Sequence, residues 1–140
     1  MSDRGHAGVE LALAIGVLMF PVALVVTAFA PWSEARVAAE ALAAETARAA
    51  VLDLSLASGM SALEESAATF SLEPDAVRVG WCGVPASRPA AGTCSLSRGA
   101  VVMVTVEVWT PLVQTPWGDI GGLWVTADHA EPIDLYRSLG

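Results

Sequence analysis

Lysine is absent from this chain of 140 residues, and arginine supplies all seven of its basic side chains. Against 15 acidic residues, this leaves a formal net charge of −8 at pH 7. A surface that binds nucleic acid needs clustered Lys and Arg, so no nucleic acid partner is expected. Only 16% of the residues are charged and 54% are hydrophobic. This composition excludes intrinsic disorder, and the length allows one domain with an added segment.

Histidine and cysteine are also scarce, at two each. A zinc site needs about four ligands, and His6 and His129 lie far apart in the sequence, so we expect no metal and no cofactor. Asp128 beside His129 is the one pattern that suggests a general base. No nucleophile motif accompanies it, and we interpret His129 as a surface or strand-end residue. The chain is therefore not expected to be an enzyme.

The two cysteines, Cys82 and Cys94, flank a segment rich in Pro, Gly, Ala and Ser. Their spacing differs from the CxxC spacing of redox sites. If the bulk of the chain lies outside the membrane, they are expected to form a disulfide. Closing a loop of this size contributes about 3 kcal/mol to stability.

The most prominent feature is an uncharged run of twenty residues, Leu11 to Ala30. At about 1.5 Å per residue, a helix of this length spans about 30 Å, the thickness of the hydrocarbon core of a bilayer. Pro21 lies in mid-span, where membrane helices tolerate it better than isolated soluble ones. Trp32 follows the run, as an aromatic belt residue would. The run predicts a transmembrane helix.

Three interpretations of this run compete: an ordinary single-span anchor, a cleavable secretory signal, or a processed leader. For the signal, Ala28 to Ala30 has the small-x-small form of a cleavage site, although Pro31 would follow the cut and makes a poor protease substrate. The basic residues Arg4 and Arg36 barely bias orientation. The short N-terminus and the later cysteines favour a cytoplasmic N-terminus with the bulk of the chain outside.

The third interpretation rests on Gly5, which is followed by four residues and then by Glu10, next to the apolar run. This arrangement resembles the leader of type IV pilin-like proteins, in which a prepilin peptidase cuts after the glycine. His6 would then be the first mature residue and Glu10 the fifth. A carboxylate at the edge of a span is costly unless it is paired. In a bundle of such helices, Glu10 of one subunit would meet the α-amino group of a neighbour and set the register of assembly; otherwise it is an interfacial residue.

Small residues recur on one face of the same helix. Gly8, Ala12 and Gly16 fall four apart, a spacing that lets helix backbones approach closely. We therefore assign these residues, with Pro21, to helix packing. Alanine is so frequent in this chain that small residues at this spacing also arise by chance.

An alanine-rich stretch from Glu34 to Ser58 continues the helix as a stalk, since Ala is the best helix former. Pro31 is a candidate break, and Gly59 is expected to end the helix as a C-terminal cap. Ser61 and Glu64 match a capping box that opens a short helix reaching about Phe70.

The remainder has the pattern of strands. The expected strands cover 76–81, 100–109 and 123–127, with Ala130 as an alternative end of the last one, and the middle one alternates Val with other residues at period two. The stretch 112–122 is expected to be a loop because of its Pro and Gly residues. These elements predict an α+β fold: a long N-terminal helix, a short helix and a small antiparallel sheet with one disulfide loop.

Taken together, the leader, the stretch AAETARAA (43–50), the strand and proline in VTVEVWTPL (104–112) and the ending TADHAEPIDLYR (126–137) resemble the TadE-like minor pilins of the Tad (tight adherence) pilus, especially those of actinobacteria. The resemblance implies a leader at 1–5, a transmembrane helix at 6–30, a helical stalk at 31–59 and an extracytoplasmic domain at 60–140. It implies a minor structural subunit of a cell-surface pilus, serving adhesion, surface attachment or DNA uptake.

The partners implied by the resemblance are other pilin subunits through the N-terminal helix, the prepilin peptidase, the inner-membrane assembly machinery and membrane lipid. The competing hypothesis is a membrane-anchored or secreted ligand-binding domain unrelated to pili. The two differ in the expected mature N-terminus. Cleavage after Gly5 favours the pilin, whereas an intact Met1 or a cut before Pro31 favours the binding domain.

Overall fold

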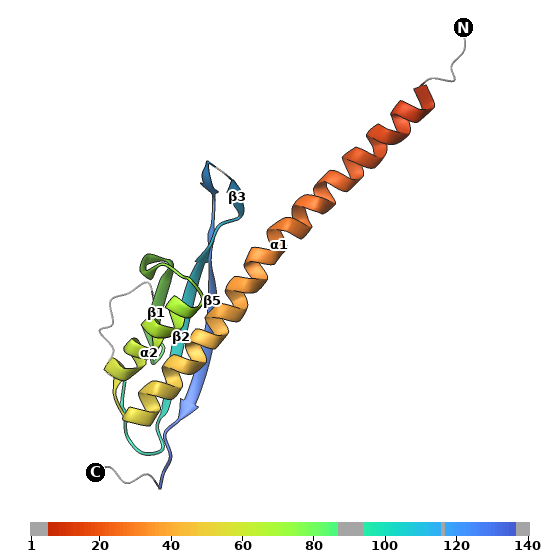
Figure 1. The fold of residues 1–140 in the computed structure, drawn as a ribbon. Coiled ribbons are helices and arrows are strands. Elements are labelled where there is room, and N and C mark those ends of the chain that lie inside the picture. Colours follow the sequence, from red (N-terminus) through yellow and green to blue (C-terminus); the bar gives the residue numbers. More distant parts are fainter. Residues whose placement is uncertain (1–5, 87–93, 116, 137–140) are drawn as a thin grey trace.

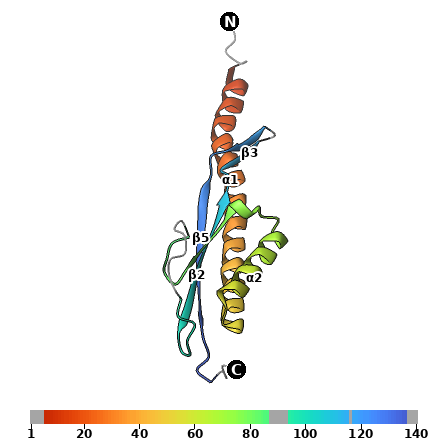
Figure 2. The same cartoon turned by 90° about the vertical axis from the view of Figure 1, so that its left-hand side faces the viewer.

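The computed structural model of the chain describes residues 6–86, 94–115 and 117–136. A helix of 48 residues, α1 (His6–Asp53), is followed by α2 (Leu56–Thr69) and a small antiparallel sheet. The sheet lies along one side of the C-terminal half of α1 and α2 lies along another, while the N-terminal half of α1 extends away from both (Figures 1 and 2). The predicted α+β fold with a long N-terminal helix is confirmed.

Three strands form the main sheet, in the order β1-β2-β5, with both pairs antiparallel. Two short strands, β3 and β4, form a separate antiparallel pair. The bounds are η2 Pro74–Ala76, β1 Val77–Trp81, β2 Val101–Thr110, β3 Val113–Thr115, β4 Gly118–Ile120 and β5 Leu123–Pro132. β2 is the central strand, and its register with β5 runs from Val101↔Pro132 to Thr110↔Leu123.

The core lies between β2 and the C-terminal half of α1. The period-two alternation of β2 buries one face completely, and the alanine-rich face of α1 packs with that face in one cluster. Alanine methyl groups let the helix backbone approach the sheet closely, while the valines fill the interface. The fully buried members are Val102, Val104, Val106 and Val108 on β2, and Ala39, Leu42, Ala43, Ala47 and Ala50 on α1.

The end of the first helix was predicted wrongly. α1 ends at Asp53 rather than Gly59, because Leu54 adopts a left-handed φ of 51°. Ser55 then caps α2, its side chain accepting a hydrogen bond from the backbone N of Ser58 at 3.4 Å. The cap predicted at Ser61 is therefore six residues too late, and Ser61 lies inside α2.

Gly59 is buried in the second turn of α2 and serves close packing instead of capping. A Cβ placed on Gly59 would lie 2.7 Å from Cη2 of Trp81 and 3.0 Å from Cβ of Ala50. A glycine at position 59 does mark a special site in the helix. Its packing role depends on neighbours from α1 and β1, which the local sequence does not reveal.

Three further expectations were wrong. α1 contains both Pro21 and Pro31 without ending, so Pro31 is not a break. The stretch 112–122 forms the β3–β4 hairpin instead of a loop, and the last strand extends to Pro132, beyond both Ala127 and the alternative end at Ala130. The extent of β5 is set by its partner, since β5 pairs with the whole length of β2.

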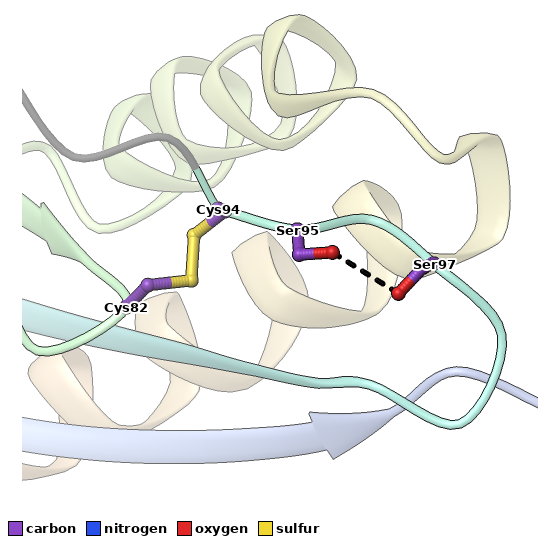
Figure 3. The surroundings of a disulfide bond; sticks show 4 residues. All are labelled: Cys82, Cys94, Ser95 and Ser97. Atoms are coloured by element: carbon purple, nitrogen blue, oxygen red, sulfur yellow. Dashed lines mark hydrogen bonds between the residues drawn. A yellow bond between two sulfur atoms is a disulfide. The ribbon is translucent and has the colours of Figure 1, made fainter.

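The predicted disulfide between Cys82 and Cys94 is confirmed (Figure 3), with a Cα–Cα distance of 5.6 Å. Cys82 directly follows β1, and its backbone N donates to the carbonyl of Met103 on β2 at 2.8 Å. The covalent link therefore ties the end of β1 to the segment that leads into β2. It fastens the edge strand to the sheet.

Candidate functional site

The N-terminal half of α1 is a continuous apolar surface exposed on all sides. From Val9 to Phe29, the large hydrophobic side chains whose exposure is described are about half to two-thirds exposed. The most apolar stretch of α1 is long enough to cross a membrane, and none of its described residues is buried. Water disfavours a contiguous apolar surface of this size, and a helix that is hydrophobic all round is normally covered. This half of α1 is the candidate functional site.

Packing on the domain begins where the apolar run stops. Phe29 and Trp32 lie with their ring centroids 5.4 Å apart at the end of the run. Among the residues of α1 whose exposure is described, the first buried one is Ala35, at 8% exposure. The helix thus has two parts with separate surroundings: an exposed apolar part up to about residue 30, and a part covered by the sheet and α2 from residue 35 onward.

Polar contacts secure the helix just after this boundary. Arg36 Nε donates to Glu40 Oε1 at 2.6 Å, and Arg36 Nη1 donates to the carbonyl of Thr126 at 2.8 Å. The second contact reaches the edge strand β5, so it fixes the apolar half of α1 relative to the sheet. This role of Arg36 was not predicted from the sequence, because Thr126 lies 90 residues away and no local pattern indicates the contact.

The predicted packing residues lie on open surface. A Cβ added to Gly8 or Gly16 would meet nothing within 4 Å, and Ala12 and Pro21 are exposed. Gly8, Ala12 and Gly16 share one helical face by their spacing of four. The face is therefore accessible to a neighbouring helix, and its assignment to packing stays a prediction.

Glu10 lies in the second turn of α1, exposed. Within the part of the chain that the structure describes, no cation pairs with it. Gly5 lies outside the described residues, and His6 is the first residue of α1. The processing role of Gly5 and His6 and the register role of Glu10 remain predictions.

The structure separates the one candidate catalytic pair. Asp128 and His129 are adjacent on β5, so their side chains project to opposite faces. Thr105 Oγ1 donates to Asp128 Oδ1 at 2.5 Å, while His129 Nε2 lies 3.1 Å from Glu131 Oε2. Among residues 6–86, 94–115 and 117–136, no group of His, Cys, Asp and Glu is arranged to hold a metal ion.

Two further surface features were missed. On the exposed face of the sheet, the Arg78 guanidinium lies 3.8 Å from the ring centroid of Trp124, which in turn contacts Trp109. At the end of the sheet nearest the N-terminal half of α1, the β3–β4 hairpin carries Trp117, which is 88% exposed. Both depend on strand pairings that the sequence does not specify.

Between α1 and the end of β2 lies a groove of about 590 Å³, whose walls include Pro31, Val37, Phe70, Trp109 and Pro111. Its volume falls in the range of small-molecule sites, about 300–1,000 Å³. Its walls are mainly apolar, and the carboxylate of Glu34 is the one charged group among its lining residues.

No family model, curated protein or solved structure matches this chain.

Proposed function

We propose that this chain is a minor pilin-like subunit: a membrane-held structural component that enters a Tad-type pilus through its N-terminal helix. The observation that carries the proposal is α1 itself, one helix from His6 to Asp53 with an exposed apolar half and a half packed on an antiparallel sheet. This division matches what the resemblance to TadE-like minor pilins implies. The apolar half would exchange lipid contacts in the membrane for helix contacts in a filament.

The assembly step needs a helix surface that accepts another helix. The face carrying Gly8, Ala12 and Gly16 is open in the single chain, and small residues there permit close backbone approach. Glu10 supplies a charge at the start of the apolar run, and the α-amino group of a neighbour processed after Gly5 is the cation that would neutralise it. Pairing of these two groups would set the axial offset between subunits.

The orientation we propose places the N-terminus in the cytoplasm and the sheet domain outside. The Cys82–Cys94 disulfide supports this orientation, because disulfides persist in oxidising compartments. The domain is then displayed on the pilus surface, where it serves adhesion or interaction with other subunits.

The groove of about 590 Å³ favours a second candidate, a membrane-anchored or secreted domain that binds an apolar ligand. A cut before Pro31 would leave in the released domain all the residues of α1 that the structure describes as buried, the first of which is Ala35. The secreted form is therefore structurally self-consistent, and the mature N-terminus distinguishes it from the pilin.

The test is the mature N-terminus of protein isolated from its native membrane, measured by intact mass and terminal sequencing. A start at His6 is expected, because prepilin-type processing removes residues 1–5 and retains the helix. A start at Pro31 would make the chain a secreted domain, and an intact Met1 would make it an ordinary anchor. Either of these two results would contradict the proposed function.

A further inference from the structure

The β3–β4 hairpin is an apolar projection with no other strand beside it. Among the strands of the described residues, β3 and β4 pair with each other and with no third strand. Leu112, Val113 and Ile120 are each about half exposed or more, and Trp117 is 88% exposed. Between Pro111 and Leu123 the sequence carries a single charge, on Asp119. The hairpin continues from the ends of β2 and β5, and its apolar side chains are exposed in the single chain. Exposed apolar patches often mark contacts with a protein or a membrane.

The register makes this hairpin amphipathic. Val113 pairs directly with Ile120, so their side chains lie on one face of the ribbon. Asp119 is the next residue along β4 and lies on the other face. One face is therefore aliphatic, the opposite face carries the charge, and Trp117 lies near the turn. An amphipathic element with an aromatic residue of this kind suits the boundary between water and lipid.

The position of the hairpin relative to α1 indicates which surface covers it. Trp109 and Pro111, which precede β3, line the same groove as Pro31 and Val37. The base of the hairpin therefore lies level with the end of the apolar run. From there the hairpin rises on the same side of the domain as the N-terminal half of α1, while the two diverge in Figure 1 (Figures 1 and 2).

The reach of the hairpin fits the outer part of a bilayer. Thr115 is four residues beyond Pro111, which at about 3.3 Å per residue gives at most about 13 Å. The hydrocarbon core is about 30 Å thick. If residues 11–30 span that core, the hairpin reaches the headgroup and upper acyl region of one leaflet without crossing it. The hairpin and the apolar half of α1 would then contact the same leaflet at two separate places.

We propose that the β3–β4 hairpin is a second membrane contact, with Trp117, Val113 and Ile120 inserted into the outer leaflet beside the transmembrane helix. The inference rests on the membrane span that is part of the proposed function. The partner is the lipid surface itself, recognised by apolar burial, because Asp119 and the net charge of −8 give no attraction to anionic headgroups. Two contacts with the bilayer fix the tilt of the sheet domain above it.

The experiment uses the full chain in phosphatidylcholine vesicles, with and without phosphatidylglycerol. A nitrobenzoxadiazole fluorophore is attached to single cysteines introduced by Trp117→Cys or Ile120→Cys, with the native disulfide intact. Val101→Cys is the matched control, on an exposed site at the opposite end of β2. Leu18→Cys reports on the span. Each probe is quenched by spin-labelled lipid from within the bilayer and by iodide from the water.

Probes at 117 and 120 are expected to lose most of their emission to spin-labelled lipid and to resist iodide, equally in both lipid mixtures. The probe at 101 is expected to show the reverse. If the probe at 18 is quenched by lipid while the probe at 117 behaves like that at 101, the hairpin inference fails and the anchor stands.

Quenching of neither 18 nor 117 by lipid would overturn both the anchor and the inference. A probe at 117 that resists both quenchers would show that protein, such as a second copy of the chain, covers the hairpin. That result would also overturn the lipid proposal while leaving the transmembrane span intact.

Discussion

The guanidinium of Arg36 donates from Nη1 to the backbone carbonyl of Thr126 at 2.8 Å, linking the helix to the sheet just beyond the apolar run. Thr126 lies on β5, which is an edge strand of the sheet formed by the described residues. Edge groups of this kind are open to pairing with other chains unless they are covered. The contact therefore covers part of the edge and positions the sheet relative to the apolar half of α1.

Replacing Arg36 with alanine is expected to lower the free energy of unfolding by about 1 kcal/mol, the usual net value of one hydrogen bond. The contact with Glu40 adds little, because both side chains are half exposed. Arg48→Ala is the matched control, since Arg48 contacts Glu45 at 3.6 Å on the surface. Urea unfolding of the full chain in detergent micelles, followed by tryptophan fluorescence, measures both. Equal midpoints for the two variants would contradict the role of Arg36.

Features encoded locally were predictable from the sequence. The apolar run at residues 11–30 can be recognised from its length and composition alone. The alternation of Val102 to Val108 shows which face of β2 is buried. The disulfide between Cys82 and Cys94 follows from two cysteines around a turn-rich segment. None of these depends on knowing what the segment contacts.

Features that depend on distant partners were not predictable. Gly59 looks like a helix cap in the sequence, but Trp81 requires its small size inside α2. The glycines and prolines of 112–122 suggest a loop, yet pairing of β2 with β5 brings the flanking residues together and a second hairpin extends from them. The roles of Gly5 and Glu10 are predicted from the leader pattern alone, because the groups that would act on them belong to other proteins.

The disulfide is expected to contribute about 3 kcal/mol to the free energy of unfolding, because it closes a loop between cysteines that are 12 positions apart in the unfolded chain. The double variant Cys82→Ser with Cys94→Ser should therefore unfold at a lower urea concentration than the unmodified chain. Adding reductant to the unmodified chain should reproduce this shift, and reductant should leave the double variant unchanged. A reduced chain as stable as the oxidised one would show that the loop is already ordered without the bond.

Gly59→Ala tests the close packing of α2 on Trp81. Alanine favours a helix over glycine by about 1 kcal/mol, so a free helical site would gain stability. Here the added Cβ would lie 2.7 Å from Trp81 Cη2, and overpacking of this kind costs about 1–3 kcal/mol. We expect a net loss of stability. Ser61→Ala, at an exposed site in the same helix, is the control and should change stability little; a stabilised Gly59→Ala variant would refute the packing argument.

Glu10→Ala separates an assembly role from an anchoring role. Removing a carboxylate next to the apolar run does not weaken membrane insertion, since charges are what the bilayer disfavours. The variant should therefore accumulate in the membrane at the normal level, but its amount in the fraction of sheared pili should drop. Immunoblots of the membrane and pilus fractions measure both quantities. Glu34→Ala, an exposed acidic residue beyond the other end of the run, is the control and should assemble normally. Because Glu34 lies on the far side of the span from the α-amino group of a neighbour, equal incorporation of the two variants would exclude a register role for Glu10.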